Sequence, residues 1–101
     1  MKKSGGNWKI LYHPAVVKKD ISKLGKPEAQ RIELAIEQKL SVNPLIYGIP
    51  LRGTLKQFWK LRVGVWRIVF TIVDKEVHIL VIAHRRESYE VAEGRRYYFS
   101  P

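Results

Sequence analysis

The sequence contains no cysteine among its 101 residues. This absence excludes a disulfide framework, a thiolate nucleophile and a zinc site with cysteine ligands, and it suits a reducing compartment. Long hydrophobic runs are also missing: the longest, "ILVIA" at 79–83, is far too short to span a bilayer. The basic start "MKKSGGNWKI" lacks the hydrophobic region of a signal peptide. We therefore expect a soluble, cytoplasmic protein that does not insert into membranes.

Acidic residues are scarce. Only 9 Asp and Glu oppose 19 Lys and Arg, which leaves a formal net charge of +10 and a pI near 10.1. Between Gln38 and Val73 the chain has no carboxylate but six cations. Such a surplus costs self-repulsion and indicates a polyanionic partner. Nucleic acid is the favoured candidate, ahead of an anionic membrane surface or an acidic protein.

The length is that of one small domain, and we expect residues 1–101 to form a single unit. Hydrophobic residues make up 46% of the chain, which is enough for a core, and no internal repeat or low-complexity tract interrupts it. The fold class that the segments below indicate is α+β.

The N-terminal half predicts a strand followed by a helical hairpin. "WKILYH" at 8–13 has the composition of a strand, and Pro14 suits the first turn of a helix. Gly25 is placed to end that helix with a left-handed cap. Helical spacing predicts that its buried stripe consists of Val17, Ile21 and Leu24.

A second helix is predicted from Pro27 to the "NP" at 43–44. The short link between the two helices favours an antiparallel αα-hairpin. Residues 45–57 contain two Gly and one Pro, and they predict a loop. The buried stripe of the second helix is expected to be Ala29, Ile32, Ile36 and Leu40.

The segment "FWKLRVGVWRIVF" at 58–70 predicts a β-hairpin with a two-residue turn at Gly64 and Val65, in which Gly takes the first position of a type II′ turn. This register places Arg62 opposite Arg67, and Lys60 on the same face. The opposite face is wholly hydrophobic and is expected to join the core. It consists of Trp59, Leu61, Val63, Trp66, Ile68 and Phe70.

Like charges directly opposite each other destabilise a sheet, so folding alone does not favour the Arg62–Arg67 pair. An anion bound between the two arginines would favour the pair. Guanidinium groups fit phosphate oxygens well. The alternative is that these side chains extend into solvent on an exposed sheet face. On a segment without carboxylates, we favour a phosphate site.

"VDKEV" at 73–77 is expected to turn the chain into a third strand over 77–84, which completes an antiparallel meander. A shift of one residue in the register would exchange the two faces of this strand. Any hydrophobic residues on the cationic face would need a cover, either the C-terminal segment or a partner. With a two-residue turn, the core face receives Val77, Ile79, Val81 and Ala83, and the cationic face receives His78, Leu80, Ile82 and His84.

The hairpin, preceded by "LRG" and followed after one strand by "IAHRRESY", resembles the RelE/ParE superfamily of type II toxins. The resemblance extends from about Trp8 to Tyr89, and the order of the predicted elements agrees with it. It implies an N-terminal strand and αα-hairpin packed on an antiparallel meander. RelE-type members are metal-independent mRNA interferases, endoribonucleases that cut mRNA in the ribosomal A site. ParE-type members share the fold but poison DNA gyrase.

The RelE pattern implies a set of site residues in this chain. The catalytic candidates are Lys60, Arg67, Arg85, Tyr89 and, as a proton carrier, His84. The candidates for binding RNA phosphates are Arg52, Lys56, Arg62 and Arg86. One position departs from the pattern: Phe58 stands where RelE members carry a second lysine, which leaves the identity of the general base open.

No group of carboxylates in the sequence is spaced for two-metal phosphoryl chemistry, and the histidines at 13, 78 and 84 form no zinc signature. We therefore expect no metal and no cofactor. Metal-free cleavage of RNA needs a base for the 2′-OH proton, cations around the phosphate and an acid for the leaving oxygen. Lys60 acts as the base if Arg62 and Arg67 disfavour its charged form; otherwise it is a phosphate contact.

Three functions remain open from the sequence: a ribosome-dependent endoribonuclease, a gyrase inhibitor without nuclease activity, and a non-catalytic RNA-binding domain. The first implies the ribosome and mRNA as partners. The first two imply a cognate acidic antitoxin. The tail "EGRRYYFSP" mixes arginines with aromatic residues, and it predicts either RNA binding or packing over the sheet.

Overall fold

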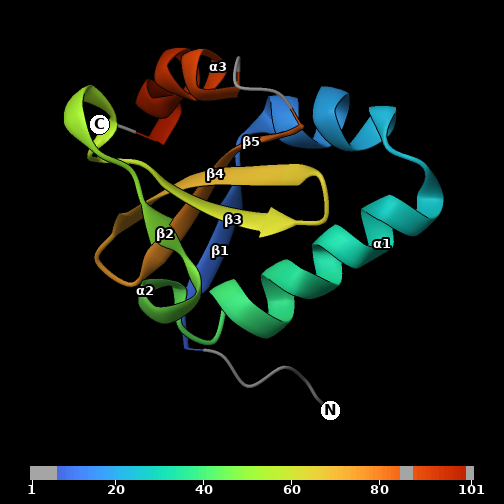
Figure 1. Cartoon of the computed structure of the whole chain (residues 1–101), viewed down its shortest axis with the longest axis horizontal. Helices are drawn as coiled ribbons and strands as arrows, with labels where there is room; N and C mark the ends of the chain where they lie inside the picture. The colour runs from blue at the N-terminus through green and yellow to red at the C-terminus, as the bar shows by residue number, and fades with distance from the viewer. Residues whose placement is uncertain (1–6, 85–87, 100–101) are drawn as a thin grey trace.

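Five strands form a mixed sheet in the order β1-β5-β4-β3-β2, with helices on both faces (Figure 1). The structure is a computed structural model that describes residues 7–84 and 88–99. β1 pairs with β5 in parallel, and all other neighbouring strands are antiparallel. The predicted α+β class is confirmed. The strands are β1 (Lys9–Tyr12), β2 (Ile49–Pro50), β3 (Trp59–Val63), β4 (Trp66–Val73) and β5 (Glu76–Ala83).

The first helical segment continues from Pro14 through the π-helical η1 (Val16–Asp20) and the short 3-10 helix η2 (Ile21–Lys23). The predicted stripe is wrong at Val17, which is 55% exposed, while Val16 is buried in its place. Ile21 and Leu24 pack against the core as predicted. Asp20 is also buried. A hydrophobic pattern cannot predict that this face of the helix is buried, because the face includes the carboxylate of Asp20, which is paired within the protein.

Gly25 begins the next helix. Its φ of −67° and ψ of 158° are extended, and it is the N-cap of α1 (Lys26–Ala35). The predicted left-handed cap is therefore wrong: Leu24, which ends the first helical segment, is also extended. Figure 1 shows the chain reversing direction at this short link, as a helical hairpin requires.

The second helix agrees with the sequence. α1 continues into the π-helical η3 (Ile36–Leu40), and Ile32, Ile36 and Leu40 are buried. The Asn43 side chain accepts a hydrogen bond from Leu45 N at 3.1 Å and caps a new helix, α2 (Pro44–Tyr47).

The predicted loop over 45–57 is wrong in part. It contains most of α2, then β2, then the 3-10 helix η4 (Gly53–Leu55). β2 pairs with β3 through Ile49 opposite Lys60 and Pro50 opposite Trp59. The two-residue strand is too short to show a period in sequence, and Pro suits an edge strand because it has no N–H to donate.

The β3–β4 hairpin has the predicted register at all five pairs, including Arg62 opposite Arg67 and Val63 opposite Trp66. Gly64 has a φ of +63°, as the first position of the predicted turn requires. Leu61, Ile68 and Phe70 are buried in one core with the helices, and Trp59, Val63 and Trp66 pack against it.

The β4–β5 pairing contains a β-bulge that the sequence did not predict. Val69 lies opposite Val81 and Phe70 opposite Ile79, so Leu80 has no partner residue. The predicted two-residue turn is confirmed, because Val73 pairs with Glu76.

Because of the bulge, the two faces of β5 exchange partway along the strand. Val77 and Ile79 join the helix-side core as predicted, but so does Ile82, which was expected on the other face. Val81 and Ala83 were expected in that core and instead pack on the opposite side, with Leu80. An inserted residue inverts the alternation of all residues beyond it.

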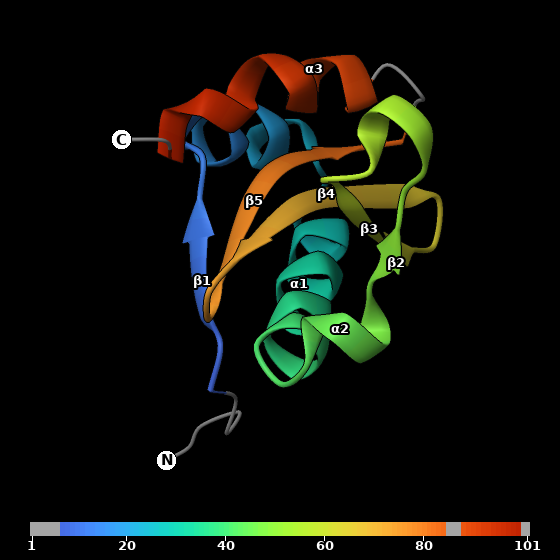
Figure 2. The ribbon, with the colours of Figure 1, turned by 90° about the vertical axis from the view of Figure 1, so that its left-hand side faces the viewer.

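A second core therefore lies on the other side of the sheet, beneath α3 (Ser88–Arg95) and the 3-10 helix η5 (Arg96–Phe99). Figure 2 shows α1 and α3 on opposite sides of the sheet. The cover predicted for Leu80 is thus the C-terminal segment. The buried members of this second core are Phe58, Val69, Leu80, Val81 and Ala92.

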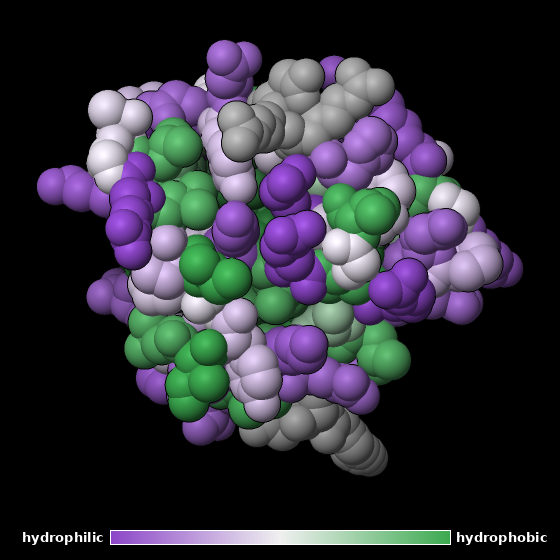
Figure 3. Space-filling model, in the orientation of Figure 1, coloured by the Kyte–Doolittle hydropathy of each residue, from purple (hydrophilic) through white to green (hydrophobic). Residues whose placement is uncertain are grey.

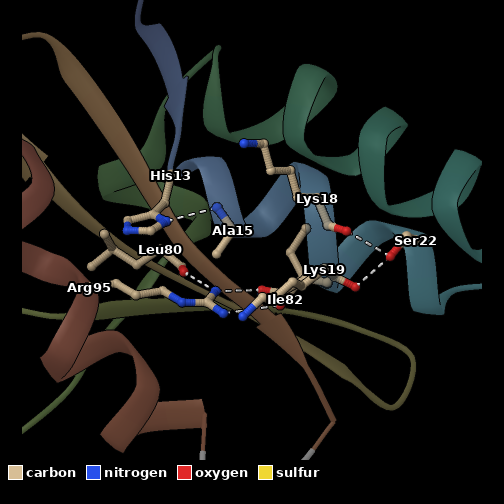
Figure 4. Close-up of polar contacts among 9 residues, drawn as sticks. His13, Ala15, Lys18, Lys19, Ser22, Leu80, Ile82 and Arg95 are labelled. Carbon is tan, nitrogen blue, oxygen red and sulfur yellow. Dashed lines mark hydrogen bonds and ion pairs between the residues drawn. The ribbon is translucent and has the colours of Figure 1, made fainter.

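The C-terminal segment is held by polar and aromatic contacts. Arg95 Nη1 donates to Asp20 Oδ2 at 2.8 Å and to Leu80 O at 2.9 Å (Figure 4). Asp20 Oδ2 also accepts from Ile82 N at 3.0 Å. The Phe99 ring stacks on His78 with a centroid distance of 4.2 Å. The tail therefore packs over the sheet, which was one of its two predicted roles.

Within the described ranges, no helix is long and hydrophobic enough to cross a bilayer.

Candidate functional site

The hairpin brings Lys60, Arg62 and Arg67 to the face of the sheet that also bears α3. Val69, directly opposite Lys60, is buried in the second core on that face. Alternation along each strand places Arg62 and Arg67 on the same face. We call Lys60, Arg62 and Arg67 the hairpin cations. Figure 3 shows hydrophilic side chains gathered over this hairpin between hydrophobic ones.

The hairpin cations lack acidic partners in the described structure. Within residues 7–84 and 88–99, the side chains of Lys60 and Arg62 make no hydrogen bond or ion pair. Arg67 Nη1 donates to the main-chain oxygen of His84 at 3.1 Å. Arg62 is exposed, and Lys60 and Arg67 are half-buried. Three positive side chains on one face with no carboxylate partner make a site suited to an anion.

Tyr89 lies on the same side of the sheet. It is half-buried and packs against the second core, which contains Phe58. Tyr89 also lines a hollow of about 270 Å³ with Thr54, Leu55, Glu90 and Glu93, so α3 and η4 meet beside it. The structure thus places Tyr89 on the face of the hairpin cations.

Phe58 is fully buried in the second core, with 0% of its surface exposed. The position at which RelE members carry a second lysine is therefore a packing position in this protein. A lysine there would have to leave the core or bury its charge.

Arg52 and Lys56 flank η4 and are both exposed. The neighbouring Leu51 and Leu55 pack against the second core, so this segment is anchored at the same side of the sheet. Neither cation is buried, and both are available to a large polyanion.

His84 follows β5 and is exposed. Its ring lies edge-on to Trp66 with a centroid distance of 5.1 Å and an angle of 73°. Arg67 donates to its main-chain oxygen, and within the described residues the His84 imidazole makes no hydrogen bond. Arg85 and Arg86 lie outside the described residues.

Arg31, on α1, is a cation that the sequence did not associate with the hairpin. Its Nη2 lies 3.1 Å from the position that a Cβ on Gly64 would occupy. The guanidinium group therefore lies against the hairpin turn. Nothing in the sequence distinguishes Arg31 from other polar residues on the exposed face of a helix.

Two groups with shifted pKa values lie elsewhere. Burial, then the charges of Glu33 and Glu37, raise the pKa of Tyr12. Burial, then the charge of Arg95, lower the pKa of His13, and Asp20 acts weakly in the opposite direction. In the described part of the chain, no three His, Asp or Glu residues are grouped as metal ligands would be.

Comparison with known proteins gives consistent similarities. A family model described as "ParE toxin of type II toxin-antitoxin system, parDE" matches residues 10–89. The toxin-antitoxin complex RelBE2 of Mycobacterium tuberculosis is similar in structure, with a TM-score of 0.71 and 26% identity over 83% of this chain and 98% of that chain. None of the curated proteins compared has a significantly similar sequence.

Two further structures are similar at lower identity, and these similarities concern the fold only. A doubly substituted Escherichia coli toxin RelE in the free state has a TM-score of 0.62 and 15% identity, over 91% of this chain and 97% of that chain. A conserved hypothetical protein of Helicobacter pylori has a TM-score of 0.56 and 18% identity, over 75% and 92% respectively.

Proposed function

This chain belongs to the ParE toxin family within the RelE/ParE superfamily of type II toxin-antitoxin systems, and we propose that it is a metal-independent, ribosome-dependent endoribonuclease. It cuts mRNA in the ribosomal A site and so inhibits translation. The observation that carries this proposal is the set of hairpin cations, with Arg62 directly opposite Arg67 and no carboxylate partner.

The chemistry proceeds without a covalent enzyme intermediate. A base removes the proton of a ribose 2′-OH, and the oxygen attacks the adjacent phosphorus. The bond to the 5′-oxygen of the next nucleotide breaks, which leaves a 2′,3′-cyclic phosphate, and an acid protonates the departing oxygen. Negative charge rises on the phosphate oxygens in the transition state, where fixed cations stabilise it most.

The roles follow from position and chemical type. Arg62 and Arg67 bind the scissile phosphate, and Lys60 on the same face acts as the base or as a third phosphate contact. Tyr89 stacks on a base or orients the 2′-OH. His84 carries the proton to the leaving oxygen, because an imidazole is a common general acid in catalysis.

The remaining candidates extend this site. Arg85 shares the role of stabilising the phosphate charge. Arg52, Lys56 and Arg86 bind the phosphates of neighbouring nucleotides.

A cognate antitoxin is proposed as the partner that holds this activity in check. The similar M. tuberculosis structure is a complex of a toxin with its antitoxin. A net charge of +10 favours an acidic partner.

The test is translation of a defined mRNA in a reconstituted system, with new 5′ ends mapped by primer extension. The wild type should cut only when ribosomes translate the message. Arg67→Ala should reduce cutting by roughly 100-fold to 1000-fold, the usual cost of one donor to a developing anion. Tyr89→Ala should also reduce it, because the nucleotide loses its orientation.

Lys39→Ala is the matched control, because it removes one exposed charge from the far end of the second helix. It should cut like the wild type. Circular dichroism should show all variants folded. Undiminished cutting by folded Arg67→Ala would remove Arg67 from the active site.

Inhibition of DNA gyrase is the second candidate function. It is favoured by the description of the matching family model and by the buried Phe58 at a position where RelE members carry a lysine. The measurement is supercoiling of relaxed plasmid by gyrase with rising protein concentration. Inhibited supercoiling with an intact mRNA would select this function, and active gyrase at high protein concentration would exclude it.

A further inference from the structure

A hollow of about 460 Å³ lies where β5 ends and α3 begins. It lies beside the hairpin cations, because Arg67 Nη1 donates to the main-chain oxygen of His84, which lines the pocket. We call it the Trp66 pocket. Its lining includes Trp66, His84, Ser88, Arg95, Asp20 and Lys23.

Two aromatic side chains form one side of this pocket. Trp66 is half-buried, and the exposed His84 ring lies edge-on to it at 5.1 Å. An indole that is partly open to a pocket offers a flat surface on which a planar ring can stack.

Ser88 supplies an unused polar group. It is only 2% exposed, and in the described part of the chain its Oγ has no hydrogen-bond partner. Buried hydroxyl groups are nearly always paired, so an unpaired one that lines a pocket points to a ligand able to donate or accept.

The charged groups of the pocket are mostly occupied within the protein. Asp20 and Arg95 form a pair at 2.8 Å, and Asp20 also accepts from Ile82 N. Lys23 is exposed and has no acidic partner within residues 7–84 and 88–99. The pocket thus combines a flat aromatic surface, one neutral hydrogen-bonding group and a free cation.

Its position connects it with the hairpin cations. Trp66 and Arg67 point to opposite faces of β4, but Arg67 Nη1 donates to the main-chain oxygen of His84 at 3.1 Å, and His84 lines the pocket. A nucleic acid strand whose phosphate is held by Arg67 therefore passes beside the pocket.

We propose that the Trp66 pocket binds one unstacked nucleobase of the RNA held by the hairpin cations. The base stacks on the Trp66 indole and exchanges a hydrogen bond with Ser88 Oγ, and Lys23 contacts a flanking phosphate. Single-stranded RNA is commonly read in this way, through stacking and hydrogen bonds to base edges. The identity of the polymer rests on the proposed function, and the pocket adds a site for base preference.

The first experiment measures the pocket without ribosomes. The indole N–H signal of Trp66 in ¹⁵N-labelled protein, assigned by its loss in Trp66→Phe, is followed during titration with AMP, GMP, CMP and UMP. At least one nucleotide should move this signal to saturation. Ser88→Ala should weaken that affinity by about tenfold, the effect of one hydrogen bond.

Ser22→Ala is the matched control, because Ser22 is an exposed serine whose hydroxyl bonds to Lys18 and Lys19 carbonyls. It should bind nucleotides like the wild type. An unmoved Trp66 signal with all four nucleotides would overturn the proposal, as would equal affinity in Ser88→Ala. A signal that moves with the antitoxin but with no nucleotide would also overturn it and assign the pocket to that protein.

The second experiment maps cuts on mRNAs that carry each of the four bases beside the cleavage position. The wild type should prefer some bases at one position, and Ser88→Ala should change that preference. Nucleotide binding at Trp66 with an intact mRNA would retain the pocket and reject the proposed nuclease. Ribosome-dependent cutting with no nucleotide binding at Trp66 would retain the nuclease and reject the pocket.

Discussion

His13 is held in its neutral form by a single hydrogen bond. The main-chain N–H of Ala15 donates to His13 Nδ1 at 3.0 Å, and a nitrogen that accepts cannot carry a proton. The ring also contacts Tyr98 with a centroid distance of 4.9 Å. Burial and the nearby Arg95 lower the pKa of His13, in agreement with this geometry.

Stability should therefore decrease as the pH falls below the pKa of a histidine in the unfolded chain, about 6.5. The folded pKa is the lower one, so the unfolded state binds the proton more tightly, and acid favours unfolding. The measurement is the urea concentration at the midpoint of unfolding, at pH values from 7.5 to 5.5, which extend roughly one unit above and below the pKa of an unfolded histidine. The midpoint should fall with pH in the wild type.

His13→Asn should flatten this dependence, because the Asn oxygen can accept from Ala15 and does not titrate. His84→Asn is the control, since His84 is exposed and, within the described residues, its ring accepts no hydrogen bond. An equally steep dependence in His13→Asn would show that another group is responsible.

At the scale of elements, the β3–β4 hairpin depends on the conformation of one glycine. Gly64 has a φ of +63°, where a side chain is strained, and an added Cβ would lie 3.1 Å from Arg31 Nη2. This hairpin carries the Arg62–Arg67 pair, so the turn also determines the geometry of the proposed site.

Gly64→Ala should lower the free energy of unfolding by about 1 kcal/mol, because alanine is disfavoured at positive φ. Gly94→Ala, near the end of α3, should raise it by roughly 0.5 kcal/mol, because alanine favours a helix and nothing lies within 4 Å of the added atom. Urea unfolding curves of both variants test whether the free energy of unfolding changes in opposite directions. Equal effects would contradict the role assigned to the turn.

α3 is attached to the rest of the fold by the ion pair between Arg95 and Asp20, whose side chains are 16% and 10% exposed. Asp20→Ala should cost about 3 kcal/mol, because it leaves a largely buried guanidinium unpaired. Ile82 N also loses its acceptor. Hydrogen exchange should then be faster over residues 88–99.

Arg95→Met combined with Asp20→Ala is the informative comparison, because it removes both charges. The double variant should recover a large part of the lost stability. If the double variant loses as much stability as Asp20→Ala and Arg95→Met lose together, the two charges are not coupled.

At the scale of the whole molecule, the net charge of +10 is distributed unevenly. The segment from 38 to 73 has no carboxylate and supplies β2, the β3–β4 hairpin and the exposed Arg52 and Lys56. The sheet face beside α3 therefore presents a cationic surface suited to a polyanion.

Binding of a single-stranded RNA oligonucleotide should weaken steeply with salt, because phosphate contacts release counterions. Arg62→Ala should reduce the slope of log K against log salt by about 0.7, the contribution of one phosphate contact on a single strand. Fluorescence anisotropy at several salt concentrations measures the slope. Lys39→Ala should leave it unchanged, and an equal reduction in both variants would mean that only net charge matters.

The local sequence determined the β3–β4 hairpin, its register, the α1–η3 stripe and the grouping of the hairpin cations. In each case a strict period or a two-residue turn decides which side chains share a face. Only the tertiary structure decided the β5 bulge, the burial of Asp20, and the placement of Arg31, Trp66 and Ser88. These features depend on partners far apart in the chain, such as Arg95 for Asp20, and no local pattern of hydrophobicity encodes a contact between distant residues.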